Sequence, residues 1–176
     1  LEHSGIAEID RFSNDFNSLL AELESWHDNL ASENAELSRR ADHDPLTGLG
    51  NRARFERMLE TAIKVAQKSR RQVALLYLDC DGFKSINDAH GHEVGDAVIC
   101  TIAERLKRSI REKDRVFRLG GDEFAVVLDN LTSLDAVDRV AARIRANMKE
   151  PVNLALRVEQ TIDLSIGVAT FPEDGE

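Results

Sequence analysis

Two adjacent carboxylates, Asp122 and Glu123, directly follow Gly120 and Gly121 between two apolar runs of β-type residues. Extended runs that meet at a glycine pair predict a hairpin, because glycine takes the positive φ angles of a tight turn without a Cβ clash. The bare glycine backbone also lets a ligand come close. A plain turn has no need of two acids, so this arrangement favours a site for a metal ion and a phosphate group.

A third carboxylate, Asp79, ends the apolar run of residues 73–79. This run has the length and the near-continuous hydrophobicity of a strand that is buried on both faces. An acid at the end of such a strand can share a cation with acids on a neighbouring strand, since Mg²⁺ takes one or two carboxylates together with phosphate oxygens. Asp79 and the glycine turn therefore predict a magnesium site that holds a nucleotide.

Other side chains near this strand end are weaker candidates. Cys80 could place its backbone near the metal, whereas its sulfur is a poor ligand for Mg²⁺. With Cys100 it makes two cysteines, which favours reduced thiols over a disulfide framework. His90, His92 and Glu93 can be interpreted as a metal cluster, but no further strong ligand stands nearby in the sequence. A phosphate-binding Gly-x-x-x-x-Gly-Lys-Ser/Thr motif is absent, which excludes a P-loop enzyme.

The hydrophobic pattern predicts the elements that would position these acids. Helices are expected at about 52–68, 95–110 and 133–149, strands at 72–79, 158–159 and 161–171, and the hairpin over 115–128. Strands that alternate with helices around one central hairpin predict an α/β (α+β) fold, in which helices flank a mainly antiparallel sheet. With 42% apolar residues, the chain can bury one sizeable core.

The N-terminal part has a different pattern. Apolar residues recur at alternating spacings of three and four over residues 9–37, with Glu33 at one core position. This strict stripe favours a coiled coil over a helix that packs on its own domain. The net charge of −9 argues against electrostatic binding to nucleic acid. No apolar run is long enough to cross a membrane, but Leu1 is an unusual first residue, so we expect an upstream segment.

Four segments in this order resemble the GGDEF family of diguanylate cyclases: residues 43–52, 79–96, 111–124 and 164–169. The resemblance implies a fold related to nucleotidyl cyclases and polymerase palms. It also implies a transferase that condenses two GTP into cyclic di-GMP and releases pyrophosphate, with Mg²⁺ or Mn²⁺ as cofactor, two ions per active site. Because one domain would carry one GTP, the active form would be a two-fold homodimer.

The resemblance also assigns roles to individual acids. Asp79, the Cys80 backbone and Asp122 match the metal ligands of the family. Glu123 matches an acid that ligates the second metal, helps to deprotonate the 3′-hydroxyl group, or does both. Catalysis is therefore expected from Asp79, Asp122 and Glu123.

Substrate contacts are expected in the segment 79–96 and at the glycine turn. An amide and a carboxylate can accept hydrogen bonds from the N–H groups on the edge of guanine. With another base, buried polar groups would stay unpaired, which disfavours its binding. From the residues alone, the amide could be a turn residue and the carboxylate a helix N-cap. The matching residues are Asn87 and Asp96 for guanine, Lys84 for the triphosphate, Phe83 packed beneath the loop, His92 as a buttress near the nucleotide, and Gly120 and Gly121 at the turn.

Arg111 and Asp114 match the inhibitory site of the family, where arginine forks hold the product against guanine and phosphate. The alternative is a solvated loop at the end of a helix, since charged residues are ordinary there. Such a site would also need arginines from elsewhere in the chain.

The domain organisation follows from these patterns. Residues 1–41 are expected to form a signalling helix, of which residues 7–20 resemble the end of a HAMP linker, and residues 42–176 the catalytic domain. We expect residues 42–50 to act as a hinge. A final helix of the family, whose Lys and Arg contact the triphosphate, is absent from this chain. The chain would then be the cytoplasmic output module of a signalling protein that is linked to the inner membrane through an upstream segment.

Two other functions remain open. A catalytically silent domain that senses GTP or cyclic di-GMP would be expected to have lost one of the metal-binding acids, and all of them are present. A coiled-coil dimerisation element with a passive globular cap would give no reason for the family spacing of Asn87 and Asp96 from Asp79.

Overall fold

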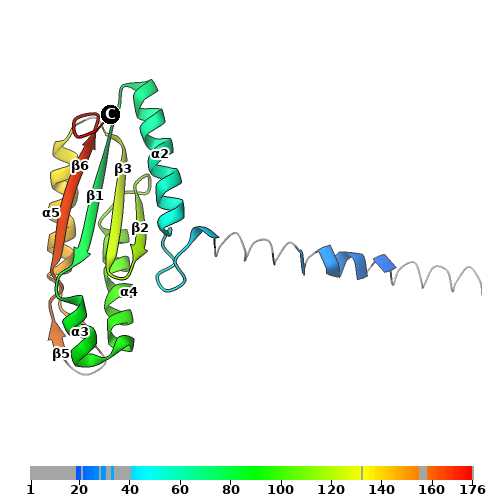
Figure 1. The fold of residues 1–176 in the computed structure, drawn as a ribbon, viewed down its shortest axis with the longest axis horizontal. Helices are drawn as coiled ribbons and strands as arrows, with labels where there is room; N and C mark the ends of the chain where they lie inside the picture. The colour runs from blue at the N-terminus through cyan, green and yellow to red at the C-terminus, as the bar shows by residue number, and fades with distance from the viewer. Residues whose placement is uncertain are drawn as a thin grey trace, which may run out of the picture. The chain divides into compact units, whose positions relative to one another are not determined.

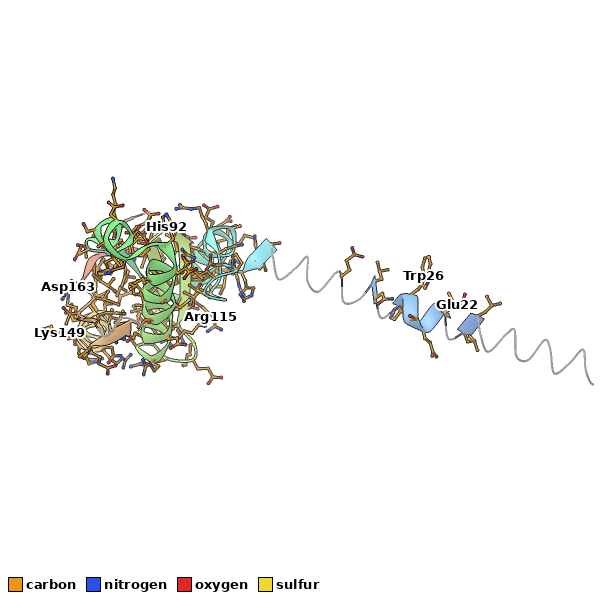
Figure 2. All side chains as sticks on the ribbon, turned by 90° about the horizontal axis from the view of Figure 1, so that it is seen from below. Glu22, Trp26, His92, Arg115, Lys149 and Asp163 are labelled. Carbon is orange, nitrogen blue, oxygen red and sulfur yellow. The ribbon has the colours of Figure 1, made fainter. Side chains whose placement is uncertain are left out.

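The structure, a computed structural model, describes residues 19–20, 22–27, 29–30, 33, 41–131, 133–154 and 158–175. The chain divides into two compact units, Leu1–Arg40 and Ala41–Glu176. The described residues of the first unit are helical, and Trp26 points outward with 77% of its surface exposed (Figure 2). The rest of the predicted coiled coil, including residues 7–18 of the HAMP-like segment, lies outside the described residues.

The second unit is built from helices and strands in alternation. Its helices are α2 (Arg52–Ser69), α3 (Phe83–His90), α4 (His92–Arg108) and α5 (Asp135–Met148), and its strands are β1 (Gln72–Cys80), β2 (Arg115–Gly120), β3 (Glu123–Leu131), β4 (Val152–Leu154), β5 (Val158–Gln160) and β6 (Leu164–Phe171). In the described part of the chain, no helix combines the length and the hydrophobicity that crossing a membrane requires.

The main sheet has four strands in the order β2-β3-β1-β6, and all neighbours pair antiparallel. Strand β1 lies in the middle because its residues are apolar on both faces. Figure 1 shows α2 on one side of this sheet, while α4 and α5 lie on the other. Strands β4 and β5 form a separate small hairpin. The predicted α+β fold with a mainly antiparallel sheet is confirmed.

Successive residues of each strand point to opposite faces of the sheet, which creates two cores. The larger core lies under α4 and α5 and contains fully buried side chains such as Leu76, Leu78 and Phe124 together with Ile99 and Ile144. Each fully buried side chain of this size contributes about 1.5–3 kcal/mol. The larger core therefore stabilises the sheet most strongly along β1 and β3, the two strands that carry the acids.

The smaller core fixes helix α2 on the opposite face. Asn51 caps the helix, because its side chain accepts a hydrogen bond from the Arg54 backbone. One turn later, the Phe55 ring meets the Phe117 ring of β2 edge to face at 5.5 Å. A Cβ atom on Gly50 would lie only 2.5 Å from Cδ1 of Phe117, so a glycine is needed there. These contacts place the start of α2 next to the hairpin turn.

The structure differs from the predicted elements at several places, and one of them is the last strand, which begins at Leu164 instead of residue 161. Residues 83–90 form helix α3, which was not predicted because only Ile86 of this short helix is buried and no period can be recognised. Strand β4 was also missed, and α4 begins at His92 instead of residue 95.

The segment of residues 42–50, for which we expect a hinge role, is bonded to the sheet in this structure, and the hinge role stays a prediction. The Asp44 carboxylate accepts hydrogen bonds from the backbone and the hydroxyl group of Thr47 at 2.8 and 2.7 Å. It also pairs with Arg118 of β2 at 3.1 Å, and both side chains are more than four-fifths buried. The Arg118 backbone donates to the Gly50 carbonyl at 2.9 Å. Both ends of the segment are thus bonded to β2.

Candidate active site

Three carboxylates meet at one end of the sheet. Strand β1 ends next to the turn between β2 and β3, and Asp79 is directly opposite Glu123 in the antiparallel pairing (Figure 1). Asp122 precedes Glu123 in the turn. Gly120 and Gly121 take φ angles of 147° and 53°, which side chains larger than hydrogen disfavour. The predicted glycine turn and the predicted neighbourhood of the strand ends are both present.

The neighbouring negative charges affect the pKa of Asp79. Its pKa is raised above the ordinary value, first by partial burial and then by the negative charges of Asp122, Glu123 and Asp81. The carboxylates thus repel one another when no cation is near. A divalent cation would relieve this repulsion, and the oxygen donors are of the kind that Mg²⁺ prefers.

The described residues contain no group of three or more His, Cys, Asp or Glu side chains that could hold a metal ion. This includes His90 and His92, whose interpretation as a metal cluster is therefore not supported. Two carboxylates are enough for Mg²⁺ when phosphate oxygens complete its coordination. The acids at the strand ends fit such a shared site, in which the nucleotide itself brings the missing ligands.

Cys80 is a buried thiol and not a thiolate. Its side chain is 2% exposed, and burial, followed by the charges of Asp122 and Asp81, raises its pKa to about 12. A protonated sulfur is a poor metal ligand, which agrees with the expectation that only the backbone of Cys80 would approach a metal. The role of that backbone remains a prediction.

Asn87 lies on α3 and has an unusual environment. Its Oδ1 atom is buried and has no hydrogen-bond partner among the described residues. A Cβ atom on Gly95 of α4 would lie 1.9 Å from this oxygen, so the amide sits directly over the glycine backbone. A buried acceptor without a donor is costly, and a ligand N–H group would satisfy it.

Asp96 lies one residue after Gly95, on the exposed side of α4. The N-cap of α4 is Gly91, and Asn87 is helical, so the alternatives of a turn residue and an N-cap are both wrong. The two residues come from adjacent helices whose contact needs a glycine. Their assignment to guanine remains a prediction.

Three further residues were expected near the substrate. Phe83 is half-buried and packs against the larger core, as expected for a residue beneath the loop. Lys84 and His92 are exposed at the starts of α3 and α4, where they are free to meet solvent or a ligand. Nothing in the structure tests their roles.

Arg111 and Asp114 lie in the loop before β2. Asp114 is only 8% exposed, and its carboxylate accepts a hydrogen bond from the Arg111 backbone at 3.1 Å, so this acid organises the loop. The Arg111 side chain is exposed and borders a cavity of about 330 Å³ that Arg54 and Arg115 also line. The alternative that this segment is a solvated loop is therefore wrong for Asp114. Binding of a product at this loop remains a prediction.

Sequence reasoning missed two arginines that brace the hairpin turn. Arg118 donates from Nε and Nη2 to the Gly121 carbonyl at 3.0 and 2.8 Å and binds Asp44 with Nη1. Arg52, the first residue of α2, forms an ion pair with Glu123 at 3.1 Å. Both arginines lie inside the segments that resemble the family, but no local pattern names their partners.

Comparison with known families gives a match over residues 41–176 to the family described as diguanylate cyclase, GGDEF domain. Among curated proteins, the diguanylate cyclase TpbB of Pseudomonas aeruginosa (strain PAO1) is 47% identical over 173 residues, which are 98% of this chain and 40% of TpbB. The diguanylate cyclase DgcN of Escherichia coli (strain K12) is 44% identical over 93% of this chain and 40% of its own length. The chain thus spans about two-fifths of these relatives.

Solved structures agree with these matches. The GGDEF domain of TpbB from P. aeruginosa superposes with a TM-score of 0.73 at 46% identity, and the match covers 76% of this chain and 78% of that one. The coiled coil and GGDEF domain of DgcB from Caulobacter crescentus, in complex with c-di-GMP, gives a TM-score of 0.80 at 28% identity and covers 88% and 82%.

Proposed function

The chain belongs to the GGDEF-domain family of diguanylate cyclases, and on that premise we propose that residues 41–176 condense two GTP into cyclic di-GMP and release two pyrophosphates. The observation that carries this proposal is the pairing of Asp79 with Glu123, beside Asp122, at the ends of adjacent strands. A module that only senses a nucleotide has no need of three acids in that position.

The reaction joins the 3′-hydroxyl group of one GTP to the α-phosphorus of another, with pyrophosphate as the leaving group. A divalent metal supplies charge neutralisation of the phosphates and lowers the pKa of the attacking hydroxyl group. Asp79 and Asp122 would hold it. The metal requirement is general for nucleotidyl cyclases of this family, while the choice of Mg²⁺ or Mn²⁺ and the number of two ions belong to the proposal.

The main contribution of the protein is to position the two reactants, and covalent chemistry by its side chains contributes less. The two strand ends are rigid, because β1 and β3 are paired along their length and buried on the larger core. The unpaired Oδ1 atom of Asn87 can accept from a guanine N–H group, and the exposed carboxylate of Asp96 can accept from another. Together these contacts would orient the base relative to the metal site.

One domain carries one such site, so the proposed active form is a homodimer in which two domains bring their GTP molecules together. The heptad pattern of residues 9–37 supports a parallel coiled coil as the dimerising element. We further place the chain on the cytoplasmic side of a membrane-linked sensor protein. That placement is supported by the HAMP-like pattern of residues 7–20.

Product inhibition through Arg111 and Asp114 is part of the same proposal. Arg143 of α5 donates from Nε to the carbonyl of Ser109, two residues before Arg111 in the chain. A second arginine therefore lies close to this loop, as binding of a guanine base and phosphate by two guanidinium groups would require.

The test is to incubate the full-length protein with GTP and Mg²⁺ and to separate the nucleotides by chromatography. We expect cyclic di-GMP from the wild type and none from Asp122→Ala, with Asp129→Ala as a matched control, because Asp129 is an exposed acid on the same hairpin. If the wild type binds GTP but makes no product, the protein is a sensor. Equal rates for Asp122→Ala and the wild type would refute the metal assignment.

A further inference from the structure

Glu123 differs from the other acids of the site in what holds its side chain. We propose that Arg52 and Tyr77 are positioning residues for Glu123, which fix its carboxylate for the condensation step. The inference rests on the proposed function, since Glu123 must act there, but it concerns residues that the family resemblance did not assign.

Arg52 joins the two strands that flank the glycine turn. Its Nη2 atom donates to Oε2 of Glu123 on β3 at 3.1 Å, and its Nε atom donates to the Leu119 carbonyl on β2 at 3.2 Å. One guanidinium group is therefore bonded on both sides of the turn. Its own backbone is fixed, because Asn51 caps α2 immediately before it.

Tyr77 reaches the same carboxylate from β1. It lies two residues before Asp79, and Glu123 is directly opposite Asp79, so Tyr77 and Glu123 are diagonal neighbours on the same face of the sheet, within reach of a long aromatic side chain. The phenol hydroxyl group of Tyr77 is a hydrogen-bond donor, and from this position it can act on the Glu123 carboxylate.

The bond from Arg52 gives Glu123 a charge environment that differs from that of Asp79. Asp79 has acids as its charged neighbours, whereas Glu123 has a guanidinium group within hydrogen-bonding distance. The Glu123 carboxylate thus has a cationic partner of its own, which the start of α2 provides.

A purely structural role does not explain this arrangement well. The Arg52 and Glu123 side chains are 53% and 39% exposed, and ion pairs with that exposure contribute little to folding stability. Lys64 and Glu60 form another exposed pair on the same helix, with both side chains 65% exposed. Lys64→Ala is therefore a matched control for the loss of one exposed cation from α2.

The experiment compares Arg52→Ala, Arg52→Lys, Tyr77→Phe and Lys64→Ala in the full-length protein. We expect Arg52→Ala to lower kcat about 10- to 100-fold, the range that misplacing a reacting group costs. Its KM, its affinity for a non-hydrolysable GTP analogue with Mg²⁺, and its melting temperature should match those of Lys64→Ala. Arg52→Lys should recover part of the rate, and Tyr77→Phe should lose less than Arg52→Ala.

A double-mutant cycle decides whether Arg52 acts through Glu123. In a Glu123→Gln background, Arg52→Ala should cause no further loss of single-turnover rate. Independent, multiplying losses would contradict the inference, as would a tenfold loss of analogue affinity, which would mean that Arg52 binds the nucleotide. If the wild type makes product and Arg52→Ala does so at the same rate, the inference alone fails. If the wild type makes none, the proposed function fails and the inference with it.

Discussion

Replacing Asp44 by asparagine should destabilise the domain, because it removes the anion that neutralises Arg118. The carboxylate accepts two hydrogen bonds from Thr47 and pairs with Arg118, and the two charged side chains are 16% and 13% exposed. The amide can keep the bonds to Thr47 through its oxygen. The negative charge is lost, however, and an NH₂ group replaces the Oδ2 atom that accepted from Nη1 of Arg118, so the guanidinium group loses its ion pair.

The expected cost follows from this one lost interaction. A hydrogen bond to a charged group contributes about 1.5–3 kcal/mol, so Asp44→Asn should lower the free energy of unfolding by about 2 kcal/mol at pH 7. The matched control is Asp42→Asn. Asp42 pairs with Arg57, and the side chains are 36% and 58% exposed, so this control should cost less than about 1 kcal/mol. Urea unfolding followed by circular dichroism measures both values.

The pH dependence of the difference provides a second check. Burial alone would raise the pKa of Asp44, but the hydrogen bonds from Thr47 and the bond and charge of Arg118 outweigh it, and the pKa lies below the ordinary 3.8. A lowered folded-state pKa means that the charge stabilises the fold above pH 3.8 and ceases to do so as the pH falls through the lowered value. Wild type and Asp44→Asn should therefore converge in acid.

Two results would refute this reasoning. An unfolding free energy of Asp44→Asn equal to that of Asp42→Asn at pH 7 would show that the partly buried pair is worth no more than an exposed one. A difference from the wild type that stays constant into acid would show that the charge of Asp44 is not its cause.

Three further predictions concern the nucleotide, the product and a thiol. Asn87→Ala combined with Asp96→Ala should reduce the preference for GTP over ATP in competition binding, because each lost hydrogen bond is worth about 1–3 kcal/mol; an unchanged preference would place guanine recognition elsewhere. Arg111→Ala should weaken inhibition by added cyclic di-GMP, and inhibition curves identical to those of the wild type would show that the loop is inert. Cys80, whose pKa of about 12 leaves almost no thiolate at pH 8, should resist iodoacetamide in the folded protein until urea is added, with the half-buried Cys100 as the internal comparison in mass spectrometry.

The sequence by itself determines the parts of the site that local patterns encode. An apolar run that ends in Asp79 and a glycine pair before Asp122 predict strand ends and a turn, because burial and backbone conformation are set within a few residues. Adjacency of the two strand ends depends in addition on the strand order β2-β3-β1-β6, which the structure gives. Longer patterns also sufficed for α2, α4 and α5, whose buried residues recur over several turns.

Short or polar segments escaped this reasoning. Helix α3 has eight residues and one buried side chain, so it offers no period to recognise. Residues 42–50 are rich in polar residues and glycine and were interpreted as a hinge. Their conformation depends on Arg118, which is 74 positions from Asp44, and composition carries no information about such a partner.

Only the tertiary structure decided how the acids are held. Arg52 and Glu123 are 71 positions apart, and they meet because α2 packs its Phe55 ring on Phe117 and so brings its first residue to the hairpin. The register of β1 against β3 makes Tyr77 a diagonal neighbour of the same residue. Residue types and spacing state which groups are present, but the direction of a carboxylate depends on donors that packing brings from distant parts of the chain.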